Sequence, residues 1–177
     1  MADLKDRMIR AAKLDVNLYE EVEADRNSMG QAMTVVILSS LAAGIGSVSS
    51  GGVSGIFWGT IAALAGWFIW AFLTYFIGTR VLPEPQTRAD VGELLRTTGF
   101  SSSPGVLRVF GVVPVLGGLV FFVTAIWMLV AMVIAVRQAL DYKSTGRAVG
   151  VCVLGWIVQI VLIILLAGIT GGLRPPA

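Results

Sequence analysis

The sequence predicts an all-α integral membrane protein, because its charged residues are segregated from long uncharged stretches. All eleven acidic residues and twelve of the thirteen Lys and Arg residues lie in three blocks, namely residues 1–28, 80–108 and 137–147. An unpaired ion in hydrocarbon costs at least ~2.5 kcal/mol on insertion scales, so a bilayer imposes this kind of segregation. The predicted architecture is a polytopic bundle of four long transmembrane helices plus one short membrane helix broken by Pro and Gly, with amphipathic helices on the cytoplasmic side.

Composition supports this fold class and excludes several functions. Hydrophobic residues make up 56% of the chain and charged residues 14%, against roughly 25% charged residues in soluble domains. There is no histidine, the commonest general base and metal ligand. The only cysteine, Cys152, has no partner for an internal disulfide, and a net charge of +2 gives no reason to expect nucleic-acid binding. We therefore expect no catalytic residue, no metal and no cofactor.

The N-terminal arm, residues 1–28, is expected to form two helices. Asp15 would fall on the apolar side of one continuous helix, which favours a break there. Asn17 followed by Glu20 resembles a capping box, so the second helix is predicted to begin at Leu18. An amphipathic, basic helix ahead of a span is expected to lie on the membrane surface as an anchor. The alternative is a helix that docks a partner.

The first pair of long spans is predicted at residues 29–48 and 56–79, with a Gly/Ser turn at 47–55 between them. Each span is long enough for a hydrocarbon core of about 30 Å. Polar residues follow, and 87–97 is predicted to be a short amphipathic surface helix.

Residues 104–140 allow two interpretations. They form either one long kinked helix or a short helix at 104–115 that turns into a full span at 119–137. The hairpin keeps the three charged blocks on one side of the membrane, as the positive-inside rule favours. At 1.5 Å per residue, 104–115 supplies only about 18 Å, so this helix is expected to be tilted or to penetrate partly. Arg108 is expected near its end on the cytoplasmic side.

The last span is predicted at residues 148–170. The domain organisation is then an arm at 1–28, a transmembrane domain at 29–173 and a tail at 174–177. With the three charged blocks inside, the N-terminus is cytoplasmic and the C-terminus lies outside. We expect this in a bacterial inner (plasma) membrane.

Few residues in the spans are candidates for function. Gln159 is the only amide deep in the membrane, and we expect it to hydrogen-bond a neighbouring helix rather than a ligand. Small residues four apart favour close helix packing, within the chain or in an oligomer. These helix-packing candidates are Gly51, Gly55, Gly59, Ala131, Ala135, Gly146 and Gly150.

Several local patterns together resemble the Yip family, whose members span the membrane several times and are named for interaction with Ypt/Rab GTPases. They are the acidic arm 15–25, Thr98-Gly-Phe100, Val-Pro-Val-Leu-Gly-Gly at 113–118, Ile126-Trp127, and Lys143-Ser-Thr-Gly-Arg-Ala148. The resemblance covers roughly residues 15–170. It implies a cytoplasmic arm, two pairs of membrane segments and a final span.

In eukaryotes this resemblance would imply a Golgi or ER trafficking protein that binds small GTPases. The chain lacks the long Gln/Pro-rich region of those members and resembles the short bacterial ones, so the GTPase inference is not carried over. What carries over is the acidic element, with Asp15, Tyr19, Glu20 and Glu21 as partner-facing or structural candidates.

Three classes of function are then compared. The favoured one is a non-enzymatic membrane scaffold or accessory subunit that binds membrane lipids and either a membrane-protein partner or a second copy of itself. The alternative is a small transporter or permeability protein for an uncharged or lipidic substrate, and helices broken in both halves would support it. A lipid-directed enzyme would need surface acids, for which Glu84, Asp90 and Glu93 are the candidates.

Overall fold

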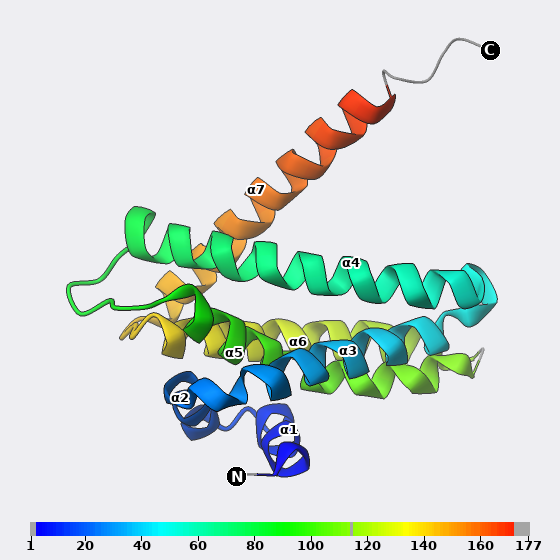
Figure 1. Cartoon of the computed structure of the whole chain (residues 1–177), viewed down its shortest axis with the longest axis horizontal. Helices are drawn as coiled ribbons and strands as arrows, with labels where there is room; N and C mark the ends of the chain where they lie inside the picture. The colour runs from blue at the N-terminus through cyan, green and yellow to red at the C-terminus, as the bar shows by residue number, and fades with distance from the viewer. Residues whose placement is uncertain (1–2, 114, 172–177) are drawn as a thin grey trace.

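The computed structural model describes residues 3–113 and 115–171, and every regular element in that part of the chain is helical (Figure 1). In chain order these are α1 (Leu4–Ala12), α2 (Val16–Ala24), η1 (Arg26–Ser28), α3 (Met29–Gly46), α4 (Val48–Phe76), η2 (Ile77–Val81), α5 (Val91–Ser101), η3 (Ser103–Val112), α6 (Gly117–Ala139) and α7 (Thr145–Gly171). The predicted tail, residues 174–177, lies outside the described residues.

Among the described residues, four helices are long and apolar enough to cross a membrane. They cover Arg26–Gly46, Gly52–Val81, Gly117–Ala139 and Thr145–Leu162. The four long spans predicted from the sequence are thus confirmed by length and composition, with boundaries shifted by a few residues.

The two ends of the helix bundle differ in polarity. The charged end carries α1, α2 and the polar segments 80–90 and 140–147. Hydrogen bonds join those two segments, since Lys143 N donates to Glu84 Oε2 at 3.0 Å and Arg147 Nη1 donates to Pro83 O at 2.7 Å. The far end carries the α3–α4 connection at Ser47 and the last residues of η3.

The connection between α3 and α4 falls within the predicted turn at 47–55 but is partly helical. Ser47 ends α3, residues 48–51 are helical, and a kink at Gly52 separates them from the long span that follows. Gly52 has a φ of 62°, in the left-handed region that glycine tolerates without a Cβ clash. The predicted turn is therefore shorter than expected, with Ser47 and Gly52 as its two breaks.

Helix α5 corrects the prediction of a surface helix at 87–97. It begins at Val91, where Asp90 and Glu93 form a capping box, and its residues from Leu94 to Ser101 are buried. The hydroxyls of Thr97 and Ser101 can be buried because each donates to a carbonyl of its own helix.

The η3 segment continues from α5 along α3 to the far end. A side chain at Gly99 would press on Ala32, and one at Gly105 would collide with Ser39 Oγ. The short helix predicted at 104–115 is found as a 3₁₀ helix at Ser103–Val112, with Pro104 in its first turn. At roughly 1.5 and 2.0 Å per residue, α5 and η3 together extend about 36 Å, comparable to a bilayer core.

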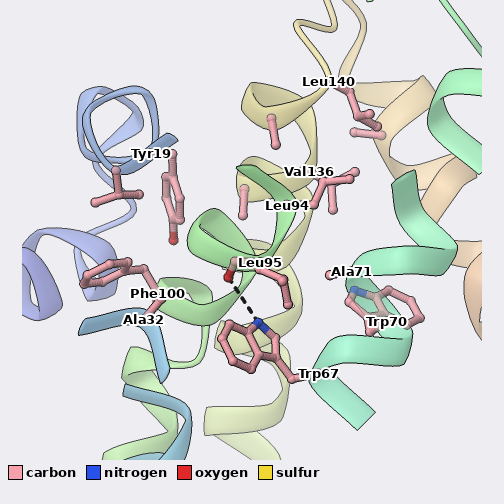
Figure 2. Close-up of a cluster of buried hydrophobic side chains, with 14 of the residues drawn as sticks. Tyr19, Ala32, Trp67, Trp70, Ala71, Leu94, Leu95, Phe100, Val136 and Leu140 are labelled. Atoms are coloured by element: carbon pink, nitrogen blue, oxygen red, sulfur yellow. Dashed lines mark hydrogen bonds between the residues drawn. The ribbon is translucent and has the colours of Figure 1, made fainter. Parts of the chain in front are cut away.

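The hydrophobic core lies in the charged half of the bundle, where the arm meets α3, α4, α5 and α6 (Figure 2). Trp67 is buried and donates its indole N–H to Leu95 O at 3.1 Å. Tyr19 from the arm and Phe100 from α5 are fully buried in the same cluster. The core therefore ties the arm to the transmembrane helices.

Candidate functional site

The arm is folded around two arginines of α1. The buried side chain of Arg7 donates to Glu21 Oε1 at 2.9 Å, to Asp25 Oδ2 at 2.9 Å and to Gln31 Oε1 at 2.8 Å. Arg10 pairs with Asp15 Oδ2 at 2.8 Å and with Glu21 Oε2 at 2.6 Å. These charge-assisted bonds connect α1, α2 and the first turn of α3.

The ion pairs shift the pKa values of the arm carboxyls. Hydrogen bonds from Arg10 lower the pKa of Asp15 and Glu21, and the bond from Arg7 lowers the pKa of Asp25. Glu23 behaves in the opposite way, because burial and then the nearby carboxylate of Asp141 raise its pKa to about 8.

A buried arginine of α5 joins the arm to the bundle. The Arg96 side chain is 5% exposed, and it donates through Nε to Val22 O at 2.9 Å and through Nη2 to Glu23 O. These carbonyls lie in the last turn of α2, where a cation is favoured by the helix dipole.

The four residues of the predicted partner-facing element mostly serve the fold of the arm. Asp15, rather than Asn17, caps α2, so α2 begins two residues earlier than predicted. Tyr19 is fully buried, and its hydroxyl has no partner among the described residues. Glu21 is held by Arg7 and Arg10, as given above. Glu20 is exposed and accepts a hydrogen bond from Gln138 Nε2, so it is the member that lies on the surface.

The small-residue faces divide into packed and open ones. Ala131 and Ala135 of α6 are fully buried, and a Cβ at Gly150 would lie 3.5 Å from Leu82 Cδ1. Gly146, also at the charged end, is exposed, and a Cβ there would meet only the Ser144 hydroxyl of its own segment, at 3.5 Å. By contrast, a Cβ at Gly55 or Gly59 would have no described atom within 4 Å. Gly51 has a helical backbone, and its surroundings lie outside the described part of the structure.

The open glycines of α4 face a cleft of about 610 Å³. The cleft is bounded by α3, α4, η3, α6 and α7, and its α4 wall consists mainly of Gly and Ala, with Ile56 and with two tryptophans at one end. That wall is formed by Gly55, Ile56, Gly59, Ala63, Gly66, Trp67 and Trp70.

Helix α7 forms the side of the cleft and then leaves the bundle. Its first half is packed, with Ala148, Val151 and Cys152 buried. From Trp156 onward its described side chains are exposed or half-buried, as for Ile164 at 64%. Figure 1 shows this half of α7 diverging from α4 and α6. We call the part of the cleft between the α4 wall and Trp156 and Gln159 of α7 the wedge.

The predicted interhelical hydrogen bond of Gln159 is not formed with any residue in the described part of the chain. The side chain lines the cleft instead, because α7 has already diverged from its neighbours at this point. Its amide group is thus a polar element of the cleft wall.

The position of Arg108 corrects a further prediction. It was expected near the cytoplasmic end of its helix, but Gly46, the last residue of α3, packs directly on Arg108 O. The reason is that η3 continues α5 away from the charged end, so residue 108 is already close to the far end. The guanidinium lines the cleft, with Nε donating to Thr124 Oγ1 at 3.2 Å and with its carbon 5.6 Å from the centre of the Phe121 ring.

The candidate acids of an enzymatic site are engaged in the fold. Glu84 accepts hydrogen bonds from Lys143 N and Gln86 Nε2, while Asp90 and Glu93 cap α5. Within the described residues, no group of three or more His, Cys, Asp or Glu side chains has the geometry to hold a metal ion.

Comparison with known proteins gives one family match. A family model described as the Yip1 domain matches residues 18–166, which includes all four long helices up to the distal part of α7. Neither the comparison with curated proteins nor that with solved structures yields a match.

Proposed function

The chain belongs to the Yip1 family, and from this premise we propose that it is a non-enzymatic membrane scaffold or accessory subunit that holds a partner protein within the bilayer. The proposed partner element is a transmembrane helix of another protein, seated in the wedge between α4 and α7. Partner contacts at the charged end would use the surface around Glu20.

The observation that supports this proposal is the open small-residue face of α4. Gly55 and Gly59 are one helical turn apart, and no described atom would touch a Cβ at either position. Small residues allow helix backbones to approach closely, which is how helices associate in a bilayer that offers no hydrophobic driving force. Ala131 and Ala135 on the equivalent face of α6 are buried within the chain, and Gly150 of α7 packs near Leu82, whereas the α4 face borders the cleft and is the one we assign to a partner.

For orientation, we propose that the charged end is cytoplasmic and that α5 and η3 together form the third crossing. The basic residues of the arm and of the 80–90 and 140–147 segments support this by the positive-inside rule. The N-terminus is then inside and the C-terminus outside, in a bacterial inner membrane. An impermeant thiol reagent applied from outside should label Ser50→Cys but not Ser144→Cys; labelling at Ser144 would reverse the orientation.

The scaffold proposal is tested by isolating the protein from native membranes in mild detergent and identifying what remains bound in stoichiometric amount. We expect one membrane protein, which is lost when Gly59→Leu fills the open face. Gly30→Leu is the matched control, because Gly30 also lies on an open helix surface but outside the cleft.

Retention of the partner by Gly59→Leu would exclude the α4 face as its binding site. A second copy of the chain in place of another protein would identify a homo-oligomer. A monomer without protein partners would contradict the scaffold proposal and favour the small transporter of an uncharged or lipidic substrate.

A further inference from the structure

We propose that the cleft binds an anionic phospholipid, with the lipid phosphate on the guanidinium of Arg108. The proposal does not rest on the scaffold function, because Arg108 belongs to the η3 wall of the cleft and not to the glycine face of α4. A lipid on Arg108 would share the cleft with a helix seated on α4.

The first support is the incomplete hydrogen bonding of Arg108. Its Nε donates to Thr124 Oγ1, but Nη1 and Nη2 have no acceptor, and the guanidinium has no acidic partner, in the described part of the chain. A charged donor within an apolar region is costly unless it is paired. The two free nitrogens form the fork that binds a phosphate through parallel hydrogen bonds.

The second support is the depth of this group in the bilayer. Thr124 lies seven residues into α6, roughly 10 Å from the far end of that helix. Helix α6 has 23 residues, roughly 35 Å, and so extends slightly beyond a core of about 30 Å. The guanidinium therefore lies roughly 8 Å inside the hydrocarbon on the far side, so a phosphate has to be drawn inward from the headgroup region to reach it.

The third support is the chemistry of the remaining lining. Phe121, Ala125, Met128 and Leu129 of α6 supply an apolar surface next to Arg108, and methionine adapts to irregular acyl chains. The volume of about 610 Å³ falls within the ~300–1,000 Å³ typical of small-molecule sites. Gln159 adds an amide that can donate to an ester carbonyl.

The charge balance of the cleft favours a lipid with a net charge of −1. The lining residues include one arginine and no carboxylate. A zwitterionic headgroup would bring an ammonium that meets no acid there, whereas phosphatidylglycerol would bring only the phosphate charge. We therefore expect phosphatidylglycerol to bind more tightly than phosphatidylcholine.

The test is native mass spectrometry of the detergent-purified chain with added phosphatidylglycerol, phosphatidylcholine or inorganic phosphate. We expect one phosphatidylglycerol per chain, little phosphatidylcholine, and no displacement by millimolar inorganic phosphate. Arg108→Gln should weaken phosphatidylglycerol binding at least about tenfold, as expected for the loss of charged hydrogen bonds. Arg108→Lys should retain part of the binding. Arg26→Gln, which removes an exposed arginine at the charged end, should leave it unchanged.

Equal binding of both lipids, or unchanged binding in Arg108→Gln, would overturn the proposal. Displacement by inorganic phosphate would assign the site to free phosphate instead.

The unaltered protein provides a check that does not depend on how the variants fold, because Trp156 and Trp70 line the cleft. One equivalent of phosphatidylglycerol with brominated acyl chains should quench tryptophan fluorescence, and excess phosphatidylglycerol, but not phosphatidylcholine, should restore it. No quenching, or equal recovery with both lipids, would contradict the proposal.

Discussion

The charged end and the far end of the molecule are built in opposite ways. At the charged end, Arg7, Arg10 and Arg96 bind side chains and helix carbonyls from the arm, so the chain satisfies its own charges. Toward the far end, α7 diverges, and the cleft exposes the glycines of α4 and the guanidinium of Arg108. The charged end is thus held by bonds within the chain, whereas the far half leaves the α4 face and Arg108 open to the cleft, where we propose that another molecule binds.

The largest effect is expected from breaking the arm network. Arg7→Ala removes a buried cation and leaves Glu21 and Asp25 without their partner. Removing one member of a fully buried pair costs about 3–5 kcal/mol. Because these two acids are 34% and 31% exposed, we expect a loss of about 2–3 kcal/mol. Thermal unfolding in detergent measures this loss of stability. Lys5→Ala, which changes an exposed residue of α1, is the control. Equal stability of the two variants would contradict a network that holds the arm.

A second comparison uses the same substitution in a packed and an open site. Gly46→Ala would place a methyl group against Arg108 O, a backbone atom that cannot move aside cheaply, so we expect a loss of about 1–3 kcal/mol. Gly59→Ala meets open space and should gain up to about 1 kcal/mol from helix propensity. Unfolding in detergent of the two variants gives both values. If Gly59→Ala destabilised as much as Gly46→Ala, the α4 face would be packed rather than open.

The smallest effect concerns the pH dependence of arm docking. The pKa of Glu23 is raised to about 8, so folding favours its protonated form, and this contribution to stability declines as pH rises from about 4.5 to 8. Glu23→Gln should flatten the dependence over that range. Asp25 has a lowered pKa, so its contribution is instead lost in acid, below its ordinary pKa. Arm protection from protease, measured against pH, separates the two. An unchanged profile for Glu23→Gln would show that the partial burial of Glu23 does not raise its pKa.

The sequence was sufficient to predict the four long spans, because charge segregation and helix length are local properties. It was misleading for α5, whose Arg96 and hydroxyl residues looked like a surface but are satisfied by helix carbonyls within the core. The continuation of α5 into η3 was missed for the same reason, and so was the position of Arg108 near the far end. The bend at Gly52 depends on one backbone angle, which composition does not specify.

The site was predicted only in part. The small-residue spacing identified Gly55 and Gly59 as packing residues, but which faces are packed within the chain depends on how α7 diverges, a tertiary feature. Tyr19 lies next to acidic residues in the sequence, and nothing in that pattern indicates its burial beneath the arm. Arg108 was visible as an isolated arginine at the border of an uncharged stretch, which was the signal for a lone cation near the membrane.

The contrast between the packed charged end and the open far end is tested most directly by photo-cross-linking in native membranes. A photoreactive amino acid is placed at Gly59 or at Gly150. Gly59 lies in the open cleft, and Gly150 packs near Leu82 at the charged end. We expect position 59 to capture a separate molecule, a partner protein above all, and position 150 to give only cross-links within the chain. Cross-links from position 59 confined to α7 of the same chain would contradict it, because the cleft would then be closed by the protein itself.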